Sequence, residues 1–349
     1  MSDYTVPARR RGRSLLIVEG NYEKELYRLI FKAFPELNID IDDVWIYETN
    51  IYELYNDIVK AYGDDWAEEE MQGIMDIDLP LIISRKKYSD KICYKEDFTN
   101  IIIVFDYERH DPEFSIEKIL QMQNCFKDST DMGKLYLNYP MIESCLHLKC
   151  LHDADYMNRK VPVTLQPGSE YKKLVKEESG IAETINFRHK IDDVLEKYYQ
   201  VNDEEEREKS CNAILEISNN NVKEELEDIL RVIGNEKEET TLKYQLAHWI
   251  KKIGYVDKNK NYWQYIREVF QQIICHNICK ADKIQNQEMD EQEELQEKFE
   301  RIDLIQILNV QNEASKDEET GFIWVLSTCT FLIPDYNFGL VNTLSSQGH

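Results

Sequence analysis

The chain has 349 residues, of which 42% are hydrophobic and 31% charged, and its formal net charge is −25. The hydrophobic fraction is sufficient for a folded core, which excludes a wholly disordered chain, and the negative charge argues against a protein that coats nucleic acid through basic patches. No apolar run approaches the roughly 20 residues of a membrane-spanning helix, no signal-peptide pattern precedes residue 14, and the eight cysteines are scattered. These features predict a cytoplasmic protein that does not associate with membranes.

The first predicted elements are a strand at residues 15–18 and a helix that begins directly after it. Glu19 stands at the end of the strand, and Pro35 ends the helical pattern. The apolar face of this helix comprises Tyr22, Leu26, Leu29, Ile30, Ala33 and Phe34. A buried strand that delivers a carboxylate to a turn and a helix places it at the carboxyl edge of an α/β sheet, where such folds bind ligands. Glu23, in the first helical turn, can face the same crevice.

The next stretch mixes regular and irregular patterns. Residues 44–47 predict a short strand, and residues 51–62 predict an amphipathic helix. Residues 66–99 are irregular and are interpreted as an insertion, within which residues 79–83 predict a short strand. This stretch also holds a basic group that could contact nucleic-acid phosphates or simply form a solvated loop, namely Arg85, Lys86 and Lys87.

A second acidic motif follows another apolar run, residues 101–105. Asp106 and Glu108 stand at its end, and residues i and i+2 of a strand share a side. Together with Glu19 they would concentrate negative charge in one crevice, which a hard divalent cation relieves. Glu19, Asp106 and Glu108 are therefore predicted metal ligands, while Glu19 or Glu23 could instead act as general base. The simpler alternative is that these acids only cap helices.

Three further residues near these motifs are site candidates. A helix is predicted at residues 115–126, with Ser115 as its N-cap, and a strand at residues 134–138. Glu143 follows that strand and could join the site or stand in a helical first turn. Lys134 could approach a phosphate, and His110 lies beside the second acidic motif.

Beyond residue 145 the pattern becomes helical. The predicted helices are residues 169–178, 187–199, 203–218, 222–232, 242–253, 262–280 and 288–308. Residues 203–240 hold 13 acidic and 5 basic side chains, which suits protein contact better than nucleic-acid contact. Residues 322–334 are apolar and rich in β-branched and aromatic residues, and they predict either a returning strand of the sheet or a buried helix.

The acidic motifs resemble those of the Toprim domain found in topoisomerases, DnaG-type primases and OLD-type nucleases. The resemblance rests on Val18-Glu19-Gly20 with Glu23, and on Asp106-Tyr107-Glu108. Residues 137–144 also resemble a segment with a late acidic residue, Glu143, in Toprim effectors of bacterial phage defence such as the PARIS effector. The resemblance covers roughly residues 14–150. It implies an α/β fold, a Toprim-like domain with a mainly parallel sheet, joined to a large helical domain or insertion.

The predicted organisation is a basic tail (1–13), the Toprim-like domain (14–150), a helical domain (151–320) and an apolar C-terminal segment (321–349). The resemblance further implies a nuclease that hydrolyses phosphodiester bonds in DNA or RNA with Mg²⁺ or Mn²⁺. Its implied catalytic residues are Glu19, Glu23, Asp106 and Glu108. The implied setting is bacterial anti-phage defence, with an ATPase as a separate partner protein or a second copy of the chain as partner. The alternative is a catalytically inactive Toprim-like protein whose helical region binds that ATPase.

Overall fold

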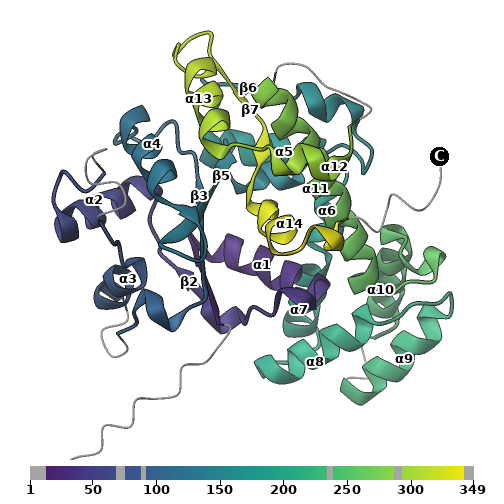
Figure 1. Ribbon diagram of the computed structural model, residues 1–349. Helices are drawn as coiled ribbons and strands as arrows, with labels where there is room; N and C mark the ends of the chain where they lie inside the picture. Colours follow the sequence, from purple (N-terminus) through teal and green to yellow (C-terminus); the bar gives the residue numbers. More distant parts are fainter. Residues whose placement is uncertain (1–12, 68–74, 88–91, 234–238, 287–292, 342–349) are drawn as a thin grey trace, which may run out of the picture. The chain divides into compact units, whose positions relative to one another are not determined.

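The computed structural model describes residues 13–67, 75–87, 92–233, 239–286 and 293–341 (Figure 1). Residues 1–12, which hold most of the predicted basic tail, lie outside this described part. The chain divides into two compact units. The first unit combines the chain up to Cys145 with Ala154–Glu177 and the chain from Ile273 onward. The second unit combines Leu146–Asp153 with Glu178–Gln272.

The first unit is built on an α/β sheet that is mainly parallel, as predicted. Four parallel strands stand in the order β2-β1-β3-β5. Their bounds are Val44–Ile46 (β2), Ser14–Val18 (β1), Asn100–Asp106 (β3) and Gly133–Tyr139 (β5). Two short antiparallel strands, β4 (Lys127–Asp128) and β8 (Leu326–Ser327), cover the outer edge of β5. An edge strand covered in this way exposes fewer unpaired backbone groups.

The register brings the carboxyl ends of the central strands to one edge of the sheet. Val18 stands opposite Val104, and Asp106 stands opposite Asn138. The β1 strand is buried throughout, and so is all of β3 after its first residue. Continuous apolar strands of this kind are typical of a parallel sheet with both faces covered.

Helices cover both faces of this sheet. Figure 1 shows α1 (Asn21–Ala33) on one side and α2 (Ile51–Tyr62), α3 (Leu79–Lys87) and α4 (Ile116–Cys125) on the other. The predicted N-cap of α4 is confirmed, since the Ser115 hydroxyl accepts a hydrogen bond from the Lys118 backbone N–H. On the opposite face, the Tyr27 hydroxyl of α1 donates to the Cys329 carbonyl at 3.0 Å.

The strand predicted at residues 79–83 is wrong, because this segment is the N-terminal part of α3. Asp78 caps the helix by accepting from the Leu81 backbone N–H at 2.8 Å. Pro80 stands in the first turn, where its missing N–H is not needed. Leu79 and Ile83 are both buried, at the i, i+4 spacing of one helical face.

The C-terminal part of the chain returns to the first unit as both strand and helix. β7 (Phe322–Trp324) pairs with β6 (Lys160–Pro162), β8 pairs with β5, and α14 (Leu332–Tyr336) follows. The long helix predicted at residues 288–308 is wrong in its described part, which contains α12 (Leu295–Glu300) and α13 (Leu304–Ala314). Asp303 separates them by capping α13 with hydrogen bonds from the Ile305 and Gln306 backbone N–H groups. Residues 288–292 lie outside the described part.

The second unit is helical. Its helices are α6 (Ala182–Ile185), α7 (Phe187–Lys197), α8 (Glu204–Leu215), α9 (Val222–Ile233) and α10 (Glu239–Ile253), followed by the first part of α11 (Tyr262–Asn286). The start of the helix predicted at residues 169–178 instead forms a short π-helix at Pro167–Tyr171, after which α5 (Lys172–Glu178) begins. In the described part of the chain, no helix is long and apolar enough to cross a membrane.

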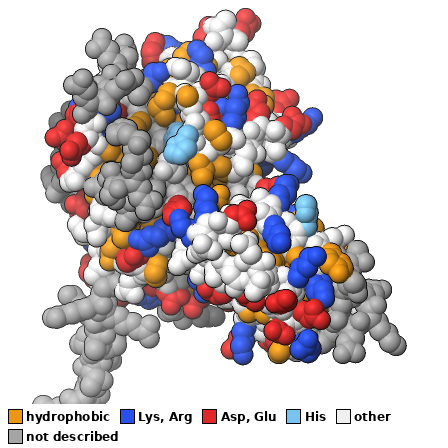
Figure 2. All heavy atoms as spheres, turned by 90° about the vertical axis from the view of Figure 1, so that its right-hand side faces the viewer, with side chains coloured by type: hydrophobic (Ala, Val, Ile, Leu, Met, Phe, Trp, Pro, Cys, Tyr) orange, Lys and Arg blue, Asp and Glu red, His pale blue; other side chains and the backbone are white. Residues whose placement is uncertain are grey.

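Acidic side chains do not form one continuous field on the face of the molecule drawn in Figure 2. Lysine and arginine side chains are interspersed with aspartate and glutamate there. Acidic side chains also form ion pairs within the second unit, where Lys252 pairs with Glu183 at 2.6 Å and Lys243 pairs with Glu227 at 3.0 Å. The excess of acid in the sequence is thus partly neutralised by local pairing.

Candidate metal centre

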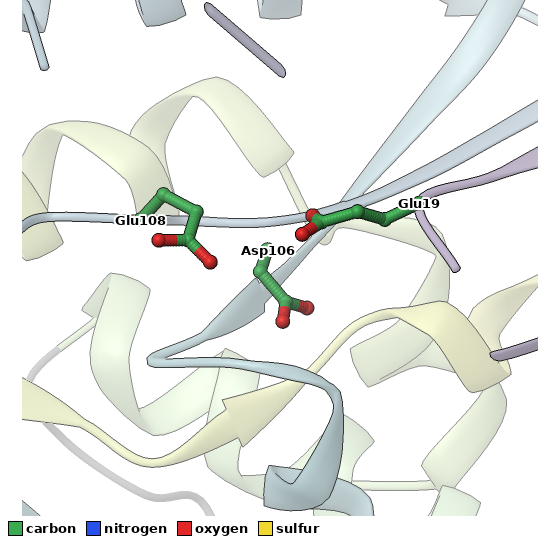
Figure 3. Close-up of side chains that lie close together, drawn as sticks. All are labelled: Glu19, Asp106 and Glu108. Atoms are coloured by element: carbon green, nitrogen blue, oxygen red, sulfur yellow. The ribbon is translucent and has the colours of Figure 1, made fainter. Parts of the chain in front are cut away.

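Three of the predicted ligands meet at the carboxyl edge of the sheet. One carboxylate oxygen from each of Glu19, Asp106 and Glu108 lies within 4.8 Å of the others. Figure 3 shows the three side chains projecting into the same space from the ends of β1 and β3. Hard divalent cations prefer such oxygen ligands. The prediction that these residues lie together is confirmed, and the cluster could hold a metal ion.

The backbone on either side of the cluster is held by specific hydrogen bonds. The Glu48 backbone N–H donates to the Glu19 carbonyl at 2.8 Å, which extends the pairing of β1 with β2 by one residue. The Gly20 backbone N–H donates to Glu23 Oε2 at 2.9 Å. Glu23 thereby joins the turn after Glu19 to the start of α1. Its carboxylate is buried beside the cluster without being one of its three members.

Burial and mutual repulsion disfavour the charged forms of these acids. Burial, followed by the charges of Glu108 and Glu23, raises the pKa of Glu19 to about 8. Burial and the neighbouring carboxylates, Glu19 first among them, also raise the pKa of Asp106 well above its ordinary value. Burial, followed by the charge of Asp111, raises the pKa of Glu108. The cluster therefore favours a bound cation or protons over bare charge.

Buried polar atoms without a hydrogen-bond partner also favour a bound cation. Glu19 Oε2 and Glu143 Oε2 are buried and have no hydrogen-bond partner in the described structure. A buried carboxylate oxygen without a donor is costly, and a cation would satisfy it. The residues present therefore fit a divalent metal ion such as Mg²⁺ or Mn²⁺.

Lys172 is a site residue that the sequence analysis missed. Its ammonium pairs with Glu143 Oε1 at 3.2 Å. Its charge lowers the pKa of Glu19, Glu23 and Glu108, against the larger effect of their burial. Burial alone would lower the pKa of Lys172, but Glu143 and other acids raise it, so the lysine stays charged. No motif marks Lys172 in the sequence, because it stands at the start of α5, far along the chain.

Glu143 and Asn138 complete the surroundings of Asp106. Glu143 is only 7% exposed, and its charge contributes to the raised pKa of Asp106. Glu143 therefore lies close enough to Asp106 to influence its charge, and its membership of the site stays a prediction. Asn138, opposite Asp106 in the sheet, has its Nδ2 3.5 Å from Asp106 Oδ1 and accepts a hydrogen bond from the Ser327 hydroxyl. Ser327, in the returning C-terminal segment, thus holds Asn138 beside Asp106.

Lys134 and His110 are not brought into the cluster. Lys134 lies at the start of β5, four residues or roughly 13 Å from the carboxyl edge, where it pairs with Asp335 at 2.6 Å. The suggestion that Lys134 reaches the site is therefore wrong, because parallel strands direct only their carboxyl ends to it. His110 follows Glu108 in a turn, and no hydrogen bond within the described residues joins its imidazole to the three carboxylates.

The basic group at the end of α3 is partly committed to structural pairing. Lys86 donates to Asp57 Oδ2 at 2.5 Å, and its ammonium lies 5.0 Å from the ring centre of Tyr47. Lys87 pairs at 2.8 Å with Glu48, the residue whose backbone N–H donates to the Glu19 carbonyl. Arg85 is exposed. The contacts of Lys86 and Lys87 are with Asp57 and Glu48 and not with the three carboxylates. The role of this basic group in binding phosphate stays a prediction.

Glu108 adopts a left-handed backbone conformation with φ of 48°. This conformation costs a residue with a side chain about 1 kcal/mol relative to glycine. We expect Glu108→Gly to be about 1 kcal/mol more stable than Glu108→Ala, although both lack the carboxylate. Urea unfolding measures the difference. Glu25, inside α1, supplies the matched control, where glycine should instead be less stable than alanine. The same order at both positions would contradict the assigned backbone strain.

No family model, curated protein or solved structure matches the chain. The class of protein is therefore described by its fold and its site alone. The protein is an α/β protein with a mainly parallel sheet and a buried carboxylate cluster at the carboxyl edge of that sheet.

Proposed function

We propose that this protein is a Toprim-like, metal-dependent nuclease that hydrolyses phosphodiester bonds in DNA or RNA. The observation that supports this most directly is the meeting of Glu19, Asp106 and Glu108 within 4.8 Å at the carboxyl edge of the sheet. Open α/β sheets bind their ligands at this edge. The order of the acidic motifs and the parallel sheet agree with the resemblance seen in the sequence.

The residues in and around the cluster would have separate roles in such a reaction. Glu19, Asp106 and Glu108 would hold Mg²⁺ or Mn²⁺, which when bound would orient water and stabilise the charge that develops on the phosphate. Lys172, charged and next to Glu143, would attract the phosphate to a site otherwise lined by acids. Glu143 would hold this lysine through Oε1 and use its unpaired Oε2 to accept a proton from the attacking water. Glu23 would position the turn that carries Glu19.

The wider setting of this proposal comes from the resemblance alone. It comprises a role in bacterial anti-phage defence and a partner ATPase or a second copy of the chain. In this setting Arg85, Lys86 and Lys87 would contact the nucleic-acid backbone near the cluster, while the helical second unit would contact protein. The ion pairs between Lys86 and Asp57 and between Lys87 and Glu48 would then have to open or be shared.

A second candidate function is a metal-free interaction protein, and two observations favour it. The ion pair of Lys172 with Glu143 and the raised pKa of Glu19 allow protons and a lysine to neutralise the cluster without metal. Such a protein would bind its partner through the helical unit and catalyse nothing. Measurement of metal-dependent cleavage separates the two functions.

The test is a cleavage assay of the purified protein with Mn²⁺ on single-stranded and double-stranded DNA and RNA. We expect cleavage by the wild type and a loss of at least roughly 100-fold in Glu19→Gln, because the metal supplies several kcal/mol of transition-state stabilisation. Glu25→Gln, an exposed substitution on α1, is the matched control and should cleave normally. Equal cleavage by Glu19→Gln and the wild type would refute the proposed site.

A further inference from the structure

Tyr22 departs from the burial pattern expected along α1. Helical spacing assigns Tyr22 to the buried face of α1, yet its side chain is 36% exposed, whereas the neighbouring Glu23 is only 7% exposed. The assignment of Tyr22 to the buried face is therefore wrong. Burying a carboxylate while exposing an aromatic ring reverses the usual preference. The reversal occurs in the first turn of α1, three residues after Glu19, so it belongs to the edge of the sheet that carries the carboxylate cluster.

The surroundings keep the Tyr22 phenol neutral and leave its hydroxyl unused. Burial of its hydroxyl end and the charges of Cys145, Glu143 and Glu23 raise the pKa of Tyr22 far above its ordinary value. No hydrogen bond to this hydroxyl exists within the described residues. Tyr22 shares the first turn of α1 with the buried Glu23, and the charges of Glu143 and Glu23 contribute to the raised pKa values of both Tyr22 and Asp106. A neutral, partly exposed ring at the rim of a charged site is suited to a flat apolar ligand.

We propose that Tyr22 stacks on the nucleobase of the nucleotide whose phosphate enters the carboxylate cluster. This inference rests on the proposed nuclease function and narrows its substrate class. In a double helix both faces of a base are covered by neighbouring bases, so Tyr22 requires a base that is unpaired or turned out of the stack. The preferred substrate is therefore a nucleic acid with an unpaired nucleotide at the cleaved bond.

The experiment measures binding in Ca²⁺, with a short fluorescein-labelled single strand offered as DNA and as RNA, and with the same strand in a duplex. A series of strands carrying one abasic position each reports which base is stacked. The variants are Tyr22→Leu, which removes the ring, and Tyr22→Phe, which removes only the hydroxyl. Tyr336→Leu is the matched control, because Tyr336 is 54% exposed in the same unit and its neighbour Asp335 pairs with Lys134 at the opposite edge of the sheet.

We expect Tyr22→Leu to bind the single strand roughly 5- to 150-fold more weakly than the wild type, the range found for loss of one base–aromatic stack. Tyr22→Phe and Tyr336→Leu should bind as the wild type does. One abasic position should weaken wild-type binding and have no further effect on Tyr22→Leu, since both changes remove the same contact. The duplex should bind more weakly than the single strand.

Equal binding by Tyr22→Leu and the wild type would overturn the inference, as would equal abasic effects in both proteins or no binding of any strand. A weakening in Tyr22→Phe equal to that in Tyr22→Leu would also overturn it, since the hydroxyl rather than the ring would then carry the contact. Cleavage in Mn²⁺ separates the two proposals. A wild type that cleaves while Tyr22→Leu binds normally refutes the stacking alone, and a wild type that stacks but never cleaves refutes the nuclease alone.

Discussion

Replacement of Asp106 by asparagine should abolish stabilisation by Mn²⁺ and stabilise the metal-free protein. Asp106 is buried among Glu19, Glu23, Glu108 and Glu143, whose charges raise its pKa. Asparagine keeps the shape of the side chain, removes the buried charge and is a weaker ligand for a divalent cation than a carboxylate. A metal that binds only the native wild type stabilises it by about 2.7 kcal/mol at 100 times its dissociation constant. We expect the variant to gain about 1 to 3 kcal/mol without metal, because asparagine removes a buried charge that its neighbours repel.

Urea unfolding in EDTA and in millimolar Mn²⁺ measures both effects. Lys172→Met is the informative comparison, because it removes a cation that competes with the metal for the same acids. This variant should retain or strengthen the stabilisation by Mn²⁺ while losing cleavage, whereas Asp106→Asn should lose both. An equal Mn²⁺ effect in the wild type and in Asp106→Asn would show that the metal binds elsewhere.

The stability of the metal-free protein should fall as the pH rises from about 5 to about 8. Burial and neighbouring acids raise the pKa of Glu19 from 4.5 to about 8 in the folded protein. Between these values the folded protein holds a proton that the unfolded chain has released. The free energy of unfolding therefore decreases as the pH rises through the folded pKa. The stabilising contribution is complete below the unfolded pKa and is lost above pH 8, with a size on the order of a few kcal/mol.

Glu19→Gln isolates this contribution, because glutamine cannot titrate. We expect a flatter dependence of the unfolding free energy on pH in Glu19→Gln than in the wild type, and an unchanged dependence in Glu25→Gln, whose side chain is 52% exposed on the same helix. Mn²⁺ should reverse the trend in the wild type, since metal binding displaces protons and strengthens with pH. Parallel pH profiles for Glu19→Gln and the wild type would contradict the raised pKa.

Local patterns in the sequence were sufficient for most of the first unit. The apolar runs before Glu19 and Asp106 correspond to β1 and β3, and the helix predicted at residues 51–62 has the bounds of α2. They succeeded because a strand buried on both faces must be apolar along its whole length and a helix on a sheet must be apolar along one stripe. The same logic places strand-end carboxylates at one edge, so Glu19, Asp106 and Glu108 were found together.

Residues 79–83 show where local pattern fails. A five-residue apolar run suits a strand or a buried helix equally well, and the choice depends on what surrounds it. Here Asp78 caps the segment as a helix, while Leu79 and Ile83 face the core together. The apolar C-terminal segment posed the same problem, and the structure contains a strand that pairs with β5 followed by the helix α14.

By itself, the sequence determined the central strands, the acidic motifs that follow two of them, and the three carboxylates that meet at the ends of these strands. Only the tertiary structure decided which other residues surround those carboxylates. Lys172, Glu143 and Asn138 come from separate segments, and folding brings them to Asp106 and Glu19 because the C-terminal ends of β3 and β5 and the start of α5 converge there. The interaction between two charges depends on their distance in space. For segments that are far apart in the sequence, the number of residues between them does not predict that distance.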